Sequence, residues 1–158
     1  MGLVNITAII GEGLVMKPIY PNWPIYVGWS KRLNCRGIQA ARAIKADEVI
    51  EVCPVIIMEH STQNGHSKQR PTNTLLDNYY YDWNQKKWCF ALGYGALYNH
   101  SYAPNAVYSF DYINKLIKYI ALTDIAKDEE ITINYNYIPT DQTPIDDWFG
   151  EYFGRKIV

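Results

Sequence analysis

Two clusters of polar and aromatic residues between Gly93 and Tyr137 constrain the fold more than any other part of the chain. The first is Asn-His-Ser at 99–101 with Pro-Asn at 104–105, and the second is Glu-Glu-Ile-Thr-Ile-Asn-Tyr-Asn-Tyr at 129–137. Proline fixes a backbone bend, and Asn and Ser side chains bond to nearby backbone groups, so the first cluster predicts a turn. Loops held by strands are where chemistry concentrates, which makes both clusters candidates for a functional site.

The segments around these clusters alternate apolar and polar residues, as β-strands do. Residues 106–111 and 116–122 predict a β-hairpin with its turn near Asn114, and residues 131–135 predict a third strand. Upstream, residues 52–58 form an apolar run rich in branched side chains, which predicts a buried strand. The chain is therefore expected to be mostly β.

Taken singly, each cluster is also typical of an ordinary surface turn or strand end, because short motifs often match by chance. Together and in this order they resemble the signature of the SET-domain protein lysine methyltransferases. That signature has an Asn-His-Ser-x-x-Pro-Asn turn, matched at 99–105. After two strands it has a Glu-[Leu/Ile]-Thr-x-x-Tyr strand ending in the catalytic tyrosine, matched at 130–135.

Residues 34–56 resemble the first motif of that family, which is Gly-x-Gly-[Val/Ile/Leu]-Phe-Ala followed by a Gly-Glu turn and an apolar strand. Three positions depart from it: Cys35 replaces the first Gly, Gln39 replaces the Phe and Asp47 replaces the turn Gly. Cys35 weakens the match only if its position needs a positive φ, which residues with side chains adopt reluctantly.

The resemblance implies a mostly β SET-domain fold of small curved sheets and short helices, with a knot-like C-terminal arrangement. It divides the chain into flanking strands and turns at 1–33, a SET domain at 34–137 and a C-terminal lid at 138–158, with a variable insert at about 59–83. It also implies that S-adenosylmethionine binds on one face and the substrate lysine on the other. A narrow channel would join them, and in it the lysine nitrogen would attack the sulfonium methyl group.

On this resemblance Tyr135 is the catalytic tyrosine, with its phenol oxygen near the transferring methyl group. Tyr108 falls where the family has a Tyr or Phe that influences the number of methyl groups added, and a Tyr there predicts mono- or dimethylation. The other candidates are Arg36, Gly37, Asn99, His100 and Trp148 for cofactor binding, and Tyr80 and Tyr137 for the lysine channel. Trp148 and Tyr80 are equally typical of core packing.

Lysine must be neutral to attack a methyl group. Its pKa of about 10.4 makes the neutral form cost about 4 kcal/mol at neutral pH. A desolvating channel lowers that pKa, and aromatic walls desolvate while their phenol oxygens still accept hydrogen bonds. The chain has 14 Tyr, 5 Trp and 4 Phe, which suits such a channel and equally suits an aromatic core.

The net charge and the positions of the cysteines argue against several other classes of protein. The net charge of -1 gives no basic field for a phosphate backbone, so direct nucleic-acid binding is not expected. Cys35, Cys53 and Cys89 are far apart and odd in number, which argues against disulfides and against a zinc site. The apolar start lacks a charged leader and is too short for a membrane span, so we expect a soluble intracellular protein, cytoplasmic or nuclear.

Two alternatives remain open at this stage. One is a SET-fold interaction module that has lost catalysis, and the other is a small aromatic β domain that binds a peptide or another ligand. The expected partner of an enzyme is a protein or peptide bearing a lysine, with a histone as one possibility, and a homodimer is also open. Nothing in the sequence selects the residues around the target lysine.

Overall fold

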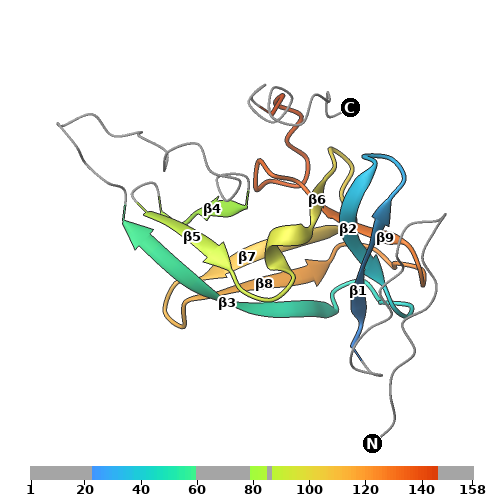
Figure 1. Cartoon of the computed structure of the whole chain (residues 1–158), viewed down its shortest axis with the longest axis horizontal. Coiled ribbons are helices and arrows are strands. Elements are labelled where there is room, and N and C mark those ends of the chain that lie inside the picture. Colours follow the sequence, from blue (N-terminus) through green and yellow to red (C-terminus); the bar gives the residue numbers. More distant parts are fainter. Residues whose placement is uncertain (1–22, 60–78, 85–86, 146–158) are drawn as a thin grey trace, which may run out of the picture.

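The computed structural model describes residues 23–59, 79–84 and 87–145, which fold as short strands with almost no helix (Figure 1). The expectation of a mostly β chain is confirmed. The elements are β1 Ile25–Ser30, β2 Cys35–Ala40, β3 Val49–Glu59, β4 Tyr80–Asp82, β5 Lys87–Ala91, the 3-10 turn η2 Gly95–Leu97, β6 Asn99–His100, β7 Ala106–Asp111, β8 Leu116–Ala121 and β9 Glu130–Ile133.

The strands form two sheets. One has the order β1-β2-β9-β6 and the other β4-β5-β3-β8-β7. Neighbouring strands pair antiparallel except β6 and β9, which run parallel with Asn99 opposite Thr132 and His100 opposite Ile133. The parallel pair brings the two polar-aromatic clusters of the sequence side by side.

Two turns of the same shape flank an isolated β-bridge between Ile44 and Ile125. Each turn places an aspartate in left-handed backbone, Asp47 at φ 67° and Asp128 at φ 66°. Asp adopts that conformation more readily than most residues because its short side chain bonds locally. Asp47 therefore adopts the left-handed backbone conformation of this turn, at a position where the family motif has Gly.

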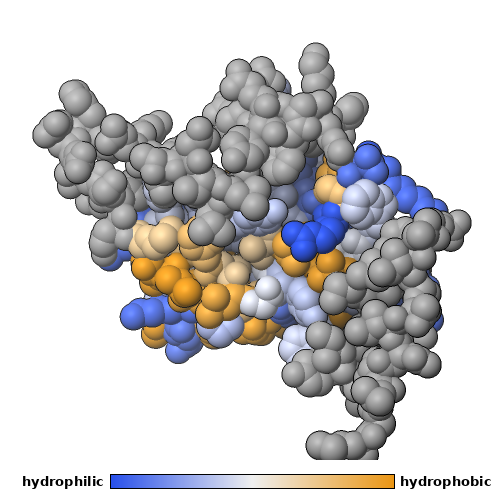
Figure 2. Space-filling view, in the orientation of Figure 1, coloured by the Kyte–Doolittle hydropathy of each residue, from blue (hydrophilic) through white to orange (hydrophobic). Residues whose placement is uncertain are grey.

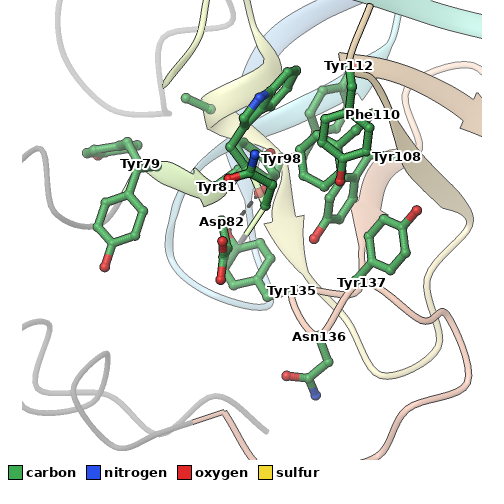
Figure 3. A pocket seen from close by; sticks show the side chains of 14 residues that line it. Tyr79, Tyr81, Asp82, Tyr98, Tyr108, Phe110, Tyr112, Tyr135, Asn136 and Tyr137 are labelled. Carbon is green, nitrogen blue, oxygen red and sulfur yellow. Dashed lines mark hydrogen bonds between the residues drawn. The ribbon is translucent and has the colours of Figure 1, made fainter. Parts of the chain in front are cut away.

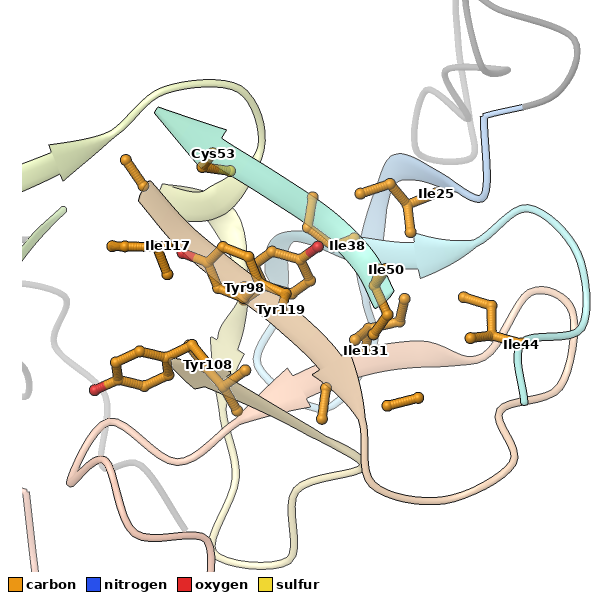
Figure 4. Close-up of a cluster of buried hydrophobic side chains, with 14 of the residues drawn as sticks. Ile25, Ile38, Ile44, Ile50, Cys53, Tyr98, Tyr108, Ile117, Tyr119 and Ile131 are labelled. Carbon is orange, nitrogen blue, oxygen red and sulfur yellow. The ribbon is translucent and has the colours of Figure 1, made fainter. Parts of the chain in front are cut away.

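Every second side chain of β8 is buried in the core. Ile117, Tyr119 and Ala121 are buried on one face of that strand, and the Tyr119 ring stacks on Tyr98 with centroids 4.4 Å apart (Figure 4). Such a ring pair contributes about 0.5–1.5 kcal/mol beyond the area it buries. The predicted hairpin is confirmed as β7 and β8, closed by Asp111, whose Oδ1 accepts the Asn114 N–H at 3.0 Å.

Two strand predictions need correction. The run at 52–58 was expected to be a buried strand, but it belongs to the longer β3, in which Val52 is 45% exposed and Ile56 is 53% exposed. One face of β3 is therefore solvent-facing, and apolar side chains gather over it in Figure 2. The strand expected at 131–135 ends at Ile133, because Asn134 starts a turn by accepting the Asn136 N–H.

Candidate active site

Tyr135 lies two residues after the end of β9, and both its backbone and its side chain are hydrogen-bonded. Its backbone N–H donates to His100 Nδ1 at 3.1 Å. Its phenol donates to the Tyr98 carbonyl oxygen at 2.9 Å (Figure 3). Burial is the main cause that raises the pKa of the Tyr135 phenol above its ordinary value. The phenol is therefore neutral and fixed in orientation.

His100 is buried at 1% exposure and serves as the acceptor in the bond from Tyr135. An imidazole that accepts at Nδ1 while neutral carries its proton on Nε2. Burial, aided by the nearby Arg32 charge, lowers the pKa of His100 to about 4, so the ring is neutral at physiological pH. Its Nε2 has no hydrogen-bond partner among the residues that the structure describes.

The two asparagines of the first cluster connect strands. The Asn99 amide nitrogen donates to the Arg36 carbonyl oxygen at 3.1 Å and to Glu130 Oε1 at 2.8 Å. The Asn105 amide nitrogen donates to the Glu130 carbonyl oxygen at 2.9 Å, and its oxygen accepts the Thr132 N–H at 2.9 Å. These contacts account for the amide side chains at both positions. The turn predicted at 99–101 begins as strand β6, which pairs with β9.

Gly37 and Cys35 lie on β2 beneath these side chains. A Cβ atom on Gly37 would lie 2.5 Å from the Asn99 amide nitrogen and 2.8 Å from Glu130 Oε1, so close packing selects Gly there. Cys35 lies in a strand and not in left-handed backbone, while Asn34 before it takes φ 51°. The replacement of Gly by Cys35 thus costs no backbone strain.

A cavity of about 480 Å³ opens beside Tyr135 (Figure 3). Its walls come from β4, β7 and the turns after β5 and β9. Ten of its fourteen lining residues are aromatic, namely Tyr79, Tyr80, Tyr81, Trp83, Tyr98, Tyr108, Phe110, Tyr112, Tyr135 and Tyr137. Such a lining is largely aromatic and presents several phenol oxygens.

Two of the three residues predicted for the lysine channel meet across this cavity. The rings of Tyr108 and Tyr137 lie edge to face with centroids 5.3 Å apart, and burial raises the pKa of the Tyr108 phenol. Tyr80 is also a lining residue, but its ring stacks on Trp88 at 4.8 Å. The next residue, Tyr81, packs edge to face on Tyr108 at 5.1 Å.

Sequence reasoning missed several lining residues, including Tyr98, Phe110 and Tyr112. Alternation along residues 106–111 was a usable signal, since it puts Phe110 on the same face as Tyr108. Nothing in the sequence distinguished Tyr98 from a core tyrosine. Trp148, most of the insert and most of the lid lie outside the described residues.

Among the residues that the structure describes, no three His, Cys, Asp or Glu side chains lie close enough together to hold a metal ion. No helix within the described ranges has the length and apolar character needed to cross a membrane.

A family model for the SET domain matches residues 35–136. The chain belongs to the SET-domain family. This match includes the whole first cluster and the second cluster as far as Asn136.

Individual relatives agree with the family. The SET domain is 34% identical over 100 residues to the histone-lysine N-methyltransferase, H3 lysine-37 specific, of Schizosaccharomyces pombe. That match covers 63% of this chain, and the chain spans 65% of the length of that relative.

Solved structures resemble the fold as well. A candidate histone methyltransferase of Plasmodium falciparum is 34% identical with a TM-score of 0.58, over 71% of this chain and 92% of that one. The Polycomb Repressive Complex 2 of Chaetomium thermophilum, in a humanized mutant bound to an inhibitor, gives a TM-score of 0.55 at 17% identity. It covers 77% of this chain and 16% of that one, and at that identity the likeness concerns the fold alone.

Proposed function

We propose that this SET domain is an S-adenosylmethionine-dependent protein lysine N-methyltransferase. The proposal rests on the position of Tyr135: its phenol donates a hydrogen bond to the Tyr98 carbonyl oxygen beside an aromatic cavity. The relative named as a histone-lysine N-methyltransferase supports the same reaction.

The cavity suits an amine that must lose its proton. Desolvation by aromatic walls disfavours the charged ammonium and lowers the lysine pKa. Burial also raises the pKa of the Tyr81, Tyr108 and Tyr135 phenols, which stay neutral and can accept a hydrogen bond from the amine. Alignment of the nitrogen in a fixed channel makes methyl transfer nearly unimolecular. The ammonium would first give up one proton to solvent, and the neutral amine would then take the methyl group as its bond to sulfur breaks.

S-adenosylmethionine, when bound, supplies the electrophilic methyl group. Two observations fit this cofactor: the buried Nε2–H of His100 is a donor that lacks a partner among the described residues, and the paired oxygen atoms of Tyr135 and Tyr98 suit a sulfonium cation. The side chains of Asn99 and His100 are already bonded to residues of β2, of β9 and of the turn after β9, so we assign their cofactor contacts mainly to backbone groups. The remaining proposed contacts are Arg36, Gly37 and Trp148.

We propose mono- or dimethylation as the product. Tyr108 is 5% exposed, and its ring touches those of Tyr81 and Tyr137. A hydroxyl in that crowded corner, by holding a water molecule or the amine, would leave less room for a methylated lysine to rotate. For the substrate we propose a histone lysine, on the names of the relatives, which also favours the nucleus as the site of action.

The test is transfer of labelled methyl groups from S-adenosylmethionine to core histones and to a cell lysate. Tyr135→Phe should lose on the order of a hundredfold or more in rate, as removal of a catalytic hydroxyl does. Tyr26→Phe is the matched control, because it removes a phenol that bonds to Asp128 at 3.0 Å, away from the cavity. If no variant labels anything and calorimetry detects no cofactor binding, the domain is an interaction module.

A further inference from the structure

Glu51 is an acidic side chain inside the core that the proposed reaction does not use. It is 7% exposed, although it stands in an apolar run. A β-bulge shifts the register of β3 between Val49 and Glu51, so that Ile50 and Glu51 are both buried in succession. Bulges of this kind re-aim a side chain and are frequent near active sites.

The carboxyl group of Glu51 is bonded to one short segment, residues 93–98. Its Oε1 accepts the Tyr94 N–H at 2.9 Å, and its Oε2 accepts the Tyr98 hydroxyl at 3.2 Å. The Cys53 thiol also donates to the carboxyl group. Gly93 has φ 81°, and a Cβ atom there would lie 2.7 Å from Glu51 Oε1. The segment thus wraps closely around the carboxyl group.

The same segment carries the acceptor for the proposed catalytic phenol. Tyr98 binds Glu51 through its hydroxyl and Tyr135 through its carbonyl oxygen. The middle of the segment is fixed as well, since the Gly95 carbonyl oxygen accepts from Tyr81 at 2.6 Å and from Tyr119 at 3.0 Å. Glu51 therefore stands two hydrogen bonds away from the phenol oxygen of Tyr135.

We propose that Glu51 is a positioning residue for Tyr135: it fixes residues 93–98 so that the Tyr98 carbonyl oxygen orients the phenol. The catalytic part of this inference rests on the proposed function. An apolar residue in place of Glu51 fills the same space but leaves the Tyr94 N–H and the Tyr98 hydroxyl unpaired inside the core. Paired, those donors lock the segment, and a small misplacement of a reacting group can cost on the order of a hundredfold in rate.

Two variants, Glu51→Met and Glu51→Gln, distinguish a positioning role of Glu51 from a contribution to folding stability alone. Met has similar length and no acceptor oxygen, so kcat should fall about tenfold to a hundredfold, with KM for the peptide changed less than about threefold. Gln keeps one acceptor for the Tyr94 N–H, and its amide group can donate to a rotated Tyr98 hydroxyl, so it should retain most of kcat. Ile44→Val is the matched control, because Ile44 is a buried core residue at the bridge to Ile125.

Rates are expressed per cofactor-binding site counted by calorimetry, which removes the effect of unfolded protein. A Glu51→Met enzyme that keeps its kcat, as Ile44→Val should, would overturn the proposal. So would a Gln variant as impaired as the Met variant.

A second readout does not depend on catalysis. In protein labelled with ¹³C at tyrosine Cζ, the resonance that Tyr135→Phe removes belongs to Tyr135. Glu51→Met should shift or broaden that resonance, and Ile44→Val should leave it in place. If the wild-type domain transfers no methyl group, the proposed function fails, and the resonance alone decides whether Glu51 positions Tyr135. An unmoved resonance refutes the positioning role.

Discussion

The backbone N–H of Tyr135 donates to Nδ1 of His100 across 3.1 Å, and this bond ties together the ends of the two parallel strands β6 and β9. It needs a neutral imidazole, because a protonated Nδ1 cannot accept. The position of the proposed catalytic tyrosine is thereby linked to the protonation of a buried histidine.

Acid should weaken the fold through His100. Its pKa is about 4 in the folded chain, against about 6.5 in an unfolded chain, so the unfolded state binds more protons between these values. Stability is therefore full above pH 6.5 and falls as the pH drops toward 4, by about 2 kcal/mol at pH 5. Urea unfolding at pH 7.5 and pH 5 measures this loss. His100→Gln should show a smaller loss, while equal losses in both proteins would contradict the assignment.

Asn105→Ala should destabilise the domain by about 2–3 kcal/mol, because it leaves the Thr132 N–H without its acceptor and removes a donor from the Glu130 carbonyl oxygen. Asn114→Ala is the comparison, since its amide bonds to Asp111 on the exposed hairpin turn. That change should cost less than about 1 kcal/mol. The midpoints of urea unfolding rank the two variants, and an equal cost would show that the Asn105 contacts contribute little.

Gly37→Ala should cost about 1–3 kcal/mol, because the added methyl group must push aside the Asn99 amide and the Glu130 carboxyl group. The same change in an Asn99→Ala background should cost less, since one obstacle is gone. A double-mutant cycle in thermal unfolding measures the difference. Strictly additive effects would mean that Gly37 and Asn99 do not share this space in solution.

Tyr108→Phe should shift the product toward higher methylation. The change removes a hydroxyl from a corner crowded by Tyr81 and Tyr137 while keeping the ring. Mass spectrometry of a modified peptide at matched turnover reads the product distribution. Tyr112→Phe is the control, because Tyr112 lines the same cavity but is 54% exposed. Trimethylation by the wild-type enzyme would contradict the product proposal.

Local patterns predicted the β7–β8 hairpin and its turn well. Alternation reports which face of a strand is buried, and Asn114 marked a turn that the structure contains. The end of β9 was missed because Ile-Asn-Tyr continues the alternation, while the Asn134 side chain turns the chain by accepting the backbone N–H of Asn136. Short polar side chains compete with strand pairing in this way, and periodicity does not register it.

The support behind Tyr135 could not be predicted from pattern alone. Glu51 looks like a solvent-facing residue between Ile50 and Val52, and only the bulge in β3 turns it inward. Tyr98 precedes the Asn-His-Ser cluster without any distinguishing neighbour, yet its carbonyl oxygen holds the phenol. These hydrogen bonds join residues that are 37 and 47 positions apart in the sequence. A pattern within a short stretch of sequence cannot reveal them.

The parallel pairing of β6 with β9 is two residues long, and the chain between its strands includes the whole β7–β8 hairpin. Contacts closed over so long a loop form late, because loop-closure entropy opposes them until the intervening structure is in place. During refolding, the hairpin should therefore appear before the β6–β9 pair and the Tyr135 contacts that depend on it. Recovery of cofactor affinity would then lag behind recovery of the hairpin, so a chain arrested in folding could hold the hairpin and still lack a working site.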